Sequence, residues 1–135
     1  MAGTVSQTLI GTTKHKILQV QWLSATGGTV SAASTAENVN HTLRGMYCVL
    51  AITDPGATTA PTNNYDIAIN DSFGCDVFGG ALENRASGSA EQCVPTGGNG
   101  DLLGPGRPIF TGLSIAITGN TVAAASGALY VVFME

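Results

Sequence analysis

Hydrophobic and polar residues alternate along much of this chain with a period of two. A β-strand places successive side chains on opposite faces, so this period indicates strands that each bury one face. The apolar sets that share a face are Leu18, Val20 and Trp22; Cys48, Leu50 and Ile52; Tyr65, Ile67 and Ile69; Leu113, Ile115 and Ile117; and Leu129, Val131 and Phe133. Each set predicts one strand.

The last of these strands is apolar on both faces. Tyr130, Val132 and Met134 alternate with the predicted core set of the same segment. A strand without a polar face is typical of the middle of a sheet or of a covered surface. We therefore expect this strand to be central in its sheet or to lie at a subunit interface.

Shorter strands are predicted at 5–10, near 76–78 and at 91–94, which gives about eight in total. Clusters of Gly, Pro, Asn and Asp separate the strands, as turns require. The segments "TAENVNHTL" and "GGALENRAS" could each form one helical turn, and no longer helix is predicted. The expected fold is all-β: a single domain over residues 1–135, built as an antiparallel β-sandwich or jelly roll.

Composition narrows the classes of partner. Charged residues make up 10% of the chain, against roughly 25% in a typical domain. A surface so poor in charge suggests extensive contact with other proteins. The net charge is −4, with five Lys and Arg in all, and so few cations predict no nucleic-acid partner. No segment approaches the apolar length of a membrane span, and the N-terminus does not resemble a signal peptide, so we expect a soluble protein made in a cytoplasm.

One stretch could carry chemistry: "NYDIAINDSFGCDVFGGALENR", in which Asp66, Asp71 and Asp76 are spaced five apart. A calcium loop of the EF-hand type needs a tighter spacing of oxygen ligands. The run from Asn70 to Gly74 fits a hairpin turn instead, because Asn and Asp cap turns and Gly accepts a positive φ. A weak divalent-ion site and a catalytic carboxylate pair remain alternatives to this hairpin turn.

The cysteines Cys48, Cys75 and Cys93 are odd in number and form no CxxC motif. We interpret them as reduced thiols, the more buried ones acting as small hydrophobes, with a Cys75–Cys93 bridge as the alternative. His15 and His41 lie in different segments and are interpreted as solvated side chains rather than metal ligands.

No other motif indicates catalysis. The chain lacks G-x-S-x-G, and its glycine-rich segment at 97–108 lacks the Lys-Ser/Thr of a phosphate loop. Trp22 lies on an apolar strand face, which predicts core packing, with a sugar-stacking platform as the alternative. The sequence thus predicts a protein that is not an enzyme and that has no cofactor and no metal.

The C-terminal half resembles a known family. The stretch "NYDIAINDSFGCDVFGGALENRASGSAEQCVP", followed by "RPIFTGLSIAITGNTVAAASGALYVVFM", is similar to a pattern in small structural proteins of tailed bacteriophages, above all head decoration (cement) proteins. The resemblance covers roughly residue 64 onward. It implies a virion protein on the capsid exterior, made in the host cytoplasm. Its partners would be the major capsid protein and further copies of itself, as a dimer or a trimer.

Residues 1–13 are either an extended arm or a plain first strand. As an arm, they would let Val5, Leu9 and Ile10 add an edge strand to a neighbour, while Lys14 and Lys16 meet an acidic capsid surface. These five are the predicted capsid or subunit contacts. The alternative functions are a tail, neck or head-fibre subunit, and a carbohydrate-binding β-sandwich.

Overall fold

The computed structural model describes residues 3–97, 101 and 106–135. Nine strands and one helix occur in this part of the chain. They are β1 (Thr4–Gly11), β2 (His15–Leu23), β3 (Ala33–Ser34), α1 (Glu37–Leu43), β4 (Tyr47–Pro55), β5 (Asp66–Asn70), β6 (Glu91–Cys93), β7 (Arg107–Pro108), β8 (Ser114–Thr118) and β9 (Ser126–Met134). The predicted all-β class is confirmed.

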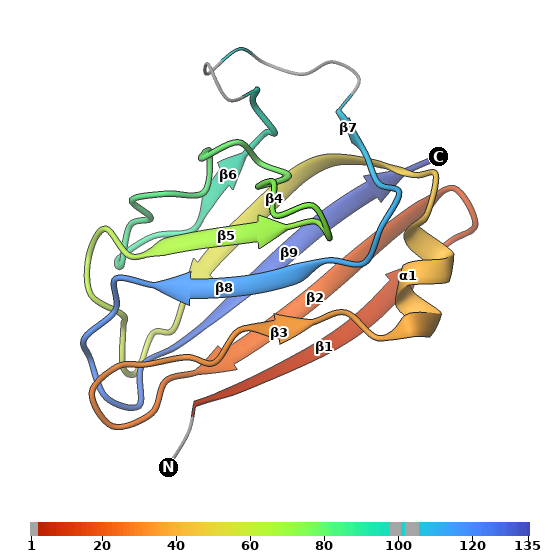
Figure 1. Cartoon of the computed structure of the whole chain (residues 1–135). Helices are drawn as coiled ribbons and strands as arrows, with labels where there is room; N and C mark the ends of the chain where they lie inside the picture. Colours follow the sequence, from red (N-terminus) through yellow and green to blue (C-terminus); the bar gives the residue numbers. More distant parts are fainter. Residues whose placement is uncertain (1–2, 98–100, 102–105) are drawn as a thin grey trace.

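The strands form two antiparallel sheets that lie face to face (Figure 1). The larger has the order β1-β2-β9-β4-β6, with β7 also paired to β4, and the smaller has the order β3-β8-β5. Strand β9 lies between β2 and β4, which confirms the first of its two predicted positions, the centre of the sheet. A jelly roll has eight strands in two sheets. The three strands of the smaller sheet do not complete that pattern, and the coarser description, a β-sandwich, is the one established.

The core fills the space between the sheets and follows the predicted alternation. The larger sheet contributes buried side chains from β2 and β9, and the smaller sheet contributes them from β5 and β8. These are Leu18, Val20, Trp22, Leu129, Val131 and Phe133 on one side, and Ile67, Ile69, Ile115 and Ile117 on the other. Four of the five predicted apolar sets thus face the core as expected.

The set on β4 was predicted wrongly. Cys48 is paired with Phe133 and Leu50 with Val132, so Val49 is an extra residue without a partner, which is a β-bulge. The bulge reverses the alternation: Cys48, Ala51 and Thr53 are buried, while Leu50 and Ile52 are only half-buried. Leu50 and Ile52 therefore lie on the face opposite to Cys48.

Three other segments differ from the sequence prediction. Helix α1 has seven residues rather than one turn. The segment predicted as a strand near 76–78 makes a single bridge, Asn70 to Asp76, and continues as turns. The short β3 and β7 were not predicted. Of the glycine-rich segment at 97–108, residues 98–100 and 102–105 lie outside the described part.

Candidate interaction surface

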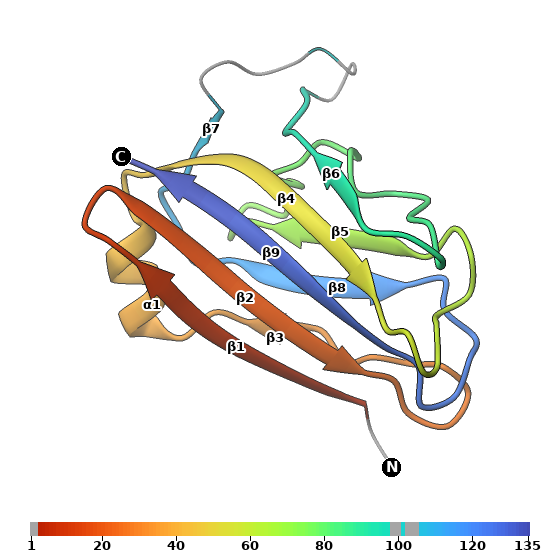
Figure 2. The same ribbon diagram turned by 180° about the vertical axis from the view of Figure 1, so that it is seen from behind.

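The outer face of the larger sheet carries an unusual number of apolar side chains. On β9, Leu129, Val131 and Phe133 point into the core, so the alternate residues Tyr130, Val132 and Met134 point outward. The bulge in β4 adds Leu50 and Ile52 to the same outer side. Figure 2 views the molecule from this side, with β1, β2, β9 and β4 adjacent to one another.

Strand register aligns four outward-facing apolar side chains in one row across the sheet. Ile10 lies opposite Ile17, Ile17 opposite Val132, and Val132 opposite Leu50. Directly opposed side chains on one sheet face have Cβ atoms about 5 Å apart. The row is therefore a continuous apolar strip across β1, β2, β9 and β4.

The two adjacent rows extend the strip. One row contains Thr8, Gln19, Tyr130, Ile52 and Gln92, and the other contains His15, Met134, Tyr47 and Pro108. None of the three rows contains Asp, Glu, Lys or Arg. Ile10, Tyr47 and Met134 are 47%, 37% and 40% exposed. We call the eight residues Ile10, Ile17, Tyr47, Leu50, Ile52, Tyr130, Val132 and Met134 the apolar face.

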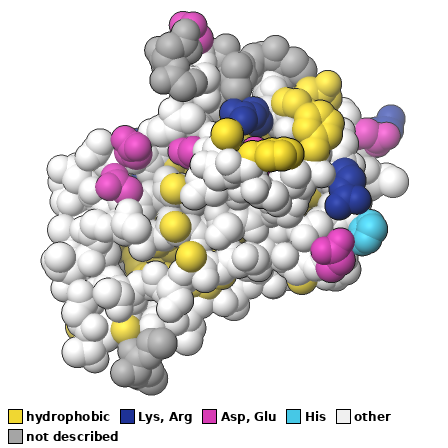
Figure 3. Space-filling view, in the orientation of Figure 1, with side chains coloured by type: hydrophobic (Ala, Val, Ile, Leu, Met, Phe, Trp, Pro, Cys, Tyr) yellow, Lys and Arg dark blue, Asp and Glu magenta, His cyan; other side chains and the backbone are white. Residues whose placement is uncertain are grey.

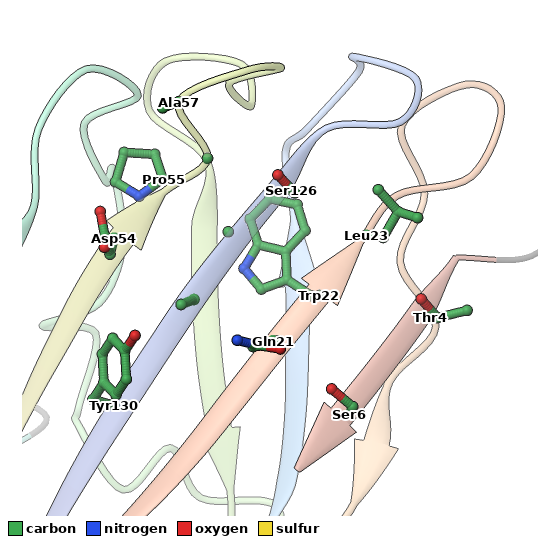
Figure 4. Close-up of a pocket in the computed structure, with 13 residues that line it drawn as sticks. Thr4, Ser6, Gln21, Trp22, Leu23, Asp54, Pro55, Ala57, Ser126 and Tyr130 are labelled. Atoms are coloured by element: carbon green, nitrogen blue, oxygen red, sulfur yellow. The ribbon is translucent and has the colours of Figure 1, made fainter. Parts of the chain in front are cut away.

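A groove of about 590 Å³ lies beyond the apolar face, toward the start of β1 (Figure 4). Thr4 and Ser6 of β1, Gln21 of β2, and Asp54 of β4 contribute polar side chains to it. The outer surface of the larger sheet thus carries the uncharged apolar face next to a polar groove.

Trp22 lies at the bottom of this groove but belongs to the core. It is buried, and its ring is 5.7 Å from that of Tyr65. Gly127 passes directly over it, because a Cβ atom at position 127 would lie 2.6 Å from the indole. The predicted core packing of Trp22 is confirmed, and no ring face is free for stacking on a sugar.

The five predicted contact residues all lie on the β1–β2 hairpin, but on different faces. Val5 and Leu9 point inward and pack against the core, whereas Ile10 points outward into the apolar face. Lys14 is exposed in the turn, and Lys16 on β2 is half-buried. The structure therefore places Ile10 on the apolar face and keeps Val5 and Leu9 out of it.

The three aspartates serve the backbone. Asp71 Oδ1 accepts hydrogen bonds from the amides of Phe73 (2.9 Å) and Cys75 (3.0 Å), and Gly74 adopts a φ of 80°. This confirms the predicted turn at Asn70–Gly74.

The other two carboxylates are held in the same way. Asp76 accepts from the amides of Phe78 (3.0 Å), Gly80 (2.8 Å) and Ile69 (3.3 Å). Asp66 accepts from the amide of Asn84 (2.8 Å). Across the described ranges, no three His, Cys, Asp or Glu side chains are grouped as a metal ion requires. All three aspartates therefore act as backbone acceptors.

The cysteines are free thiols, as predicted: Cys48 and Cys93 are buried and Cys75 is exposed. Burial raises the pKa of both buried thiols, although the Arg85 guanidinium, 2.8 Å from the Cys93 sulfur, opposes the rise there. Both remain protonated at neutral pH and are poor nucleophiles. His41 is exposed and lies 3.5 Å from Glu37 on α1, in agreement with a solvated histidine.

The sequence alone did not place half of the apolar face, namely Ile17, Tyr47, Leu50 and Ile52. Residues 47–52 are nearly all apolar, so their alternation carries no signal for the bulge that turns Leu50 and Ile52 outward. A second exposed apolar site was also missed. Phe73 and Phe110, 80% and 67% exposed, flank a hollow of about 170 Å³ beside Arg107. Figure 3 shows the smaller-sheet side, where exposed hydrophobic side chains gather near a basic one.

Comparisons with known proteins identify no family. Neither the protein-family models nor the curated protein sequences give a match to this chain. Among the described residues, no helix is long and apolar enough to cross a membrane. The surface itself and the sequence resemblance are therefore the two indications of function.

Proposed function

We propose that this chain is a bacteriophage capsid decoration protein that binds the outside of the assembled head and bridges major capsid subunits. The apolar face is the observation that carries the proposal. Three adjacent rows without a charged side chain form a contact surface that can be dehydrated at little electrostatic cost. The resemblance of residues 64–135 to phage head proteins supports the same function.

The mechanism is stabilisation by selective binding. A protein that binds only the assembled lattice stabilises it by its binding free energy, repeated at every site. Each contact needs only modest strength when several are linked, since the second binding event then occurs at high effective concentration. Ile10, the predicted contact on the apolar face, would lie against the major capsid protein, and Lys14 at the adjacent turn would face its acidic groups.

A tail, neck or head-fibre subunit is the alternative within the same class, because the apolar face suits any protein lattice. A carbohydrate-binding module would have to use the polar groove. Trp22 at the bottom of that groove is buried, so its ring offers no stacking face, and Tyr130 is the one partly exposed aromatic side chain in the lining. This observation favours a structural role over carbohydrate binding.

The test combines stoichiometry with a surface variant. Quantitative mass spectrometry of purified virions should give a copy number near that of the major capsid protein, or a simple fraction of it. Purified protein should then cosediment with expanded heads that lack it, and Val132→Lys should weaken this binding about tenfold or more, because it buries an unpaired charge. Thr118→Lys, on the exposed end of β8 in the other sheet, is the matched control and should bind like wild type.

Other outcomes would redirect the assignment. A handful of copies per virion would place the chain in the tail or neck. Absence from the particle, or equal binding of Val132→Lys and the control, would overturn the head-binding proposal. Circular dichroism and thermal melting of both variants ensure that a loss of binding does not reflect unfolding.

A further inference from the structure

Strand β1 leaves a long edge of the larger sheet unpaired. Its eight residues pair with β2 in one continuous register, and no other described strand pairs with its other side (Figure 2). Natural sheets usually protect such an edge with a charge, a proline, a bulge or a very short strand. The sequence of β1, TVSQTLIG, has none of these features.

The remaining described edges are protected. The free side of β5 is covered by the segment that follows it, through hydrogen bonds from Val77 to Ile69 (2.7 Å), from Ile67 to Leu82 (3.0 Å) and from Arg85 to Tyr65 (2.7 Å). Strands β3, β6 and β7 are two or three residues long. Strand β1 is thus the exception in the part of the chain that the structure describes.

Gln7, near the centre of β1, has an unsatisfied polar atom. Its Nε2 donates to the carbonyl of Ser34 at 3.4 Å, while its Oε1 is buried and has no hydrogen-bond partner. A buried acceptor left unpaired costs about 1–3 kcal/mol. Gln7 lies on the inner side of the sheet, between Val5 and Leu9.

We propose that β1 pairs antiparallel with β1 of a second copy, about a two-fold axis at Gln7. Side chains in a strand alternate between the two faces of the sheet. A pairing that keeps the cores of both copies on the same side of the extended sheet must therefore match odd-numbered residues of one copy with odd-numbered residues of the other. An axis at residue 7 places Val5 opposite the partner's Leu9 and Ser6 opposite the partner's Thr8. It uses every residue of the strand from Thr4 to Ile10 and leaves only Gly11 outside the pairing.

The unsatisfied side-chain amide of Gln7 favours this register over the two adjacent ones. With the axis at residue 7, the two Gln7 side chains lie side by side with Cβ atoms about 5 Å apart. Each Nε2 keeps its bond to Ser34 and has a second hydrogen for the partner's Oε1. An axis at residue 6 or 8 would instead place Gln7 opposite an apolar side chain, Val5 or Leu9, and leave Oε1 unpaired.

Charge also permits self-pairing. A two-fold axis brings identical side chains together, so a strand that self-pairs must avoid charge near the axis, and β1 has none. The basic residues Lys14, His15 and Lys16 follow Gly11, four residues from the axis. The two Gly11 positions would be about 26 Å apart at 3.3 Å per residue, well beyond the Debye length of about 8 Å.

The experiment tests both dimerisation and register. Sedimentation velocity should show a wild-type dimer at micromolar concentration. Ser6→Lys/Thr8→Lys places introduced lysines directly opposite one another at both ends of the paired segment, and should be monomeric at the same concentration. Ser6→Lys/Thr8→Glu places each lysine opposite a glutamate and should restore the dimer. Ser6 and Thr8 are exposed, so all variants should fold.

A mixing experiment excludes misfolding as the cause. Ser6→Lys/Thr8→Lys and Ser6→Glu/Thr8→Glu should each be monomeric alone and should form a one-to-one dimer when mixed. A monomeric wild type at hundreds of micromolar would overturn the inference, and so would equal association of the Lys/Lys and Lys/Glu variants. The experiment uses the chain alone, so its result is independent of head binding.

Discussion

At the scale of single residues, Asp76 stabilises the fold more than its half-buried position in a turn-rich segment indicates. Its carboxylate accepts hydrogen bonds from the backbone amides of Ile69, Phe78 and Gly80, which have no partner in a strand or helix. Phe78 is fully buried, so the carboxylate holds a turn that carries a large core side chain.

Replacing this carboxylate should therefore be costly. Asp76→Ala should lower the free energy of unfolding by about 3 kcal/mol, since hydrogen bonds to charged groups contribute about 1.5–3 kcal/mol each and partly buried donors lose their acceptor. Asp71→Ala, which removes two bonds at the surface, should cost about 1 kcal/mol. Urea denaturation measures both. Equal, small losses would show that Asp76 is not a structural acceptor.

Tyr65 gives the molecule a pH dependence. Its side chain is fully buried, and its hydroxyl has no hydrogen-bond partner of acceptable geometry. Burial, with the nearby Glu91 charge, raises the pKa of Tyr65 to about 12, whereas an unfolded tyrosine ionises near pH 10. The unfolded chain thus loses this proton first, and stability falls as pH rises from about 10 to about 12.

Tyr65→Phe should remove this part of the pH dependence. At pH 7 the variant should be as stable as wild type, or more stable by about 1 kcal/mol, because it removes a buried unpaired hydroxyl. Above pH 10 the difference should grow in its favour. Cys48 and Cys93 are present in both proteins, so their ionisation cancels in the comparison. Parallel curves from pH 7 to 12 would contradict the assignment.

At the scale of the elements, the bulge at Val49 determines which side chains form the apolar face. It sets Cys48 and Ala51 on one side of β4, and Leu50 and Ile52 on the other. Without Val49, the β4 side chains on one side of the bulge would point to the opposite face of the sheet.

Deleting Val49 should therefore disrupt the fold, while Val49→Ala should cost only about 1 kcal/mol. The deletion would either push β4 out of register with β9 or exchange its buried and outward side chains. We expect a loss of several kcal/mol in urea denaturation, or no folded protein. A deletion variant with nearly normal stability would show that the bulge is not required.

Helix α1 shows how tertiary contacts override weak local preference. Seven residues are too few for a helix to be stable by itself. The Thr35 hydroxyl just before it accepts from the amide of Leu113 (3.0 Å), and Leu43 at its end is buried in the core. The helix is therefore stabilised at both ends by the sandwich.

At the scale of the whole molecule, the two proposed contacts are compatible. Pairing of β1 with its copy would extend the larger sheet and keep both outer faces on the same side. Two apolar faces would then lie next to each other, with Ile10 of each copy near the junction. A dimer that binds a lattice through two linked faces gains avidity over a monomer. The free edge of β1 and the apolar face would thus contribute to the same assembly, a dimer bound to the capsid lattice.

Local sequence chemistry was enough to predict the β class, four of the five core sets and the turn at Asn70–Gly74. These follow from alternation and from turn residues, whereas the position of the last strand and the state of the thiols were each predicted with an alternative. Tertiary structure decided the bulge, the helix, the short strands and the apolar face. These depend on register between segments that are distant in the chain, such as Val132 with Leu50, and residue pattern within one strand does not encode its partner's register.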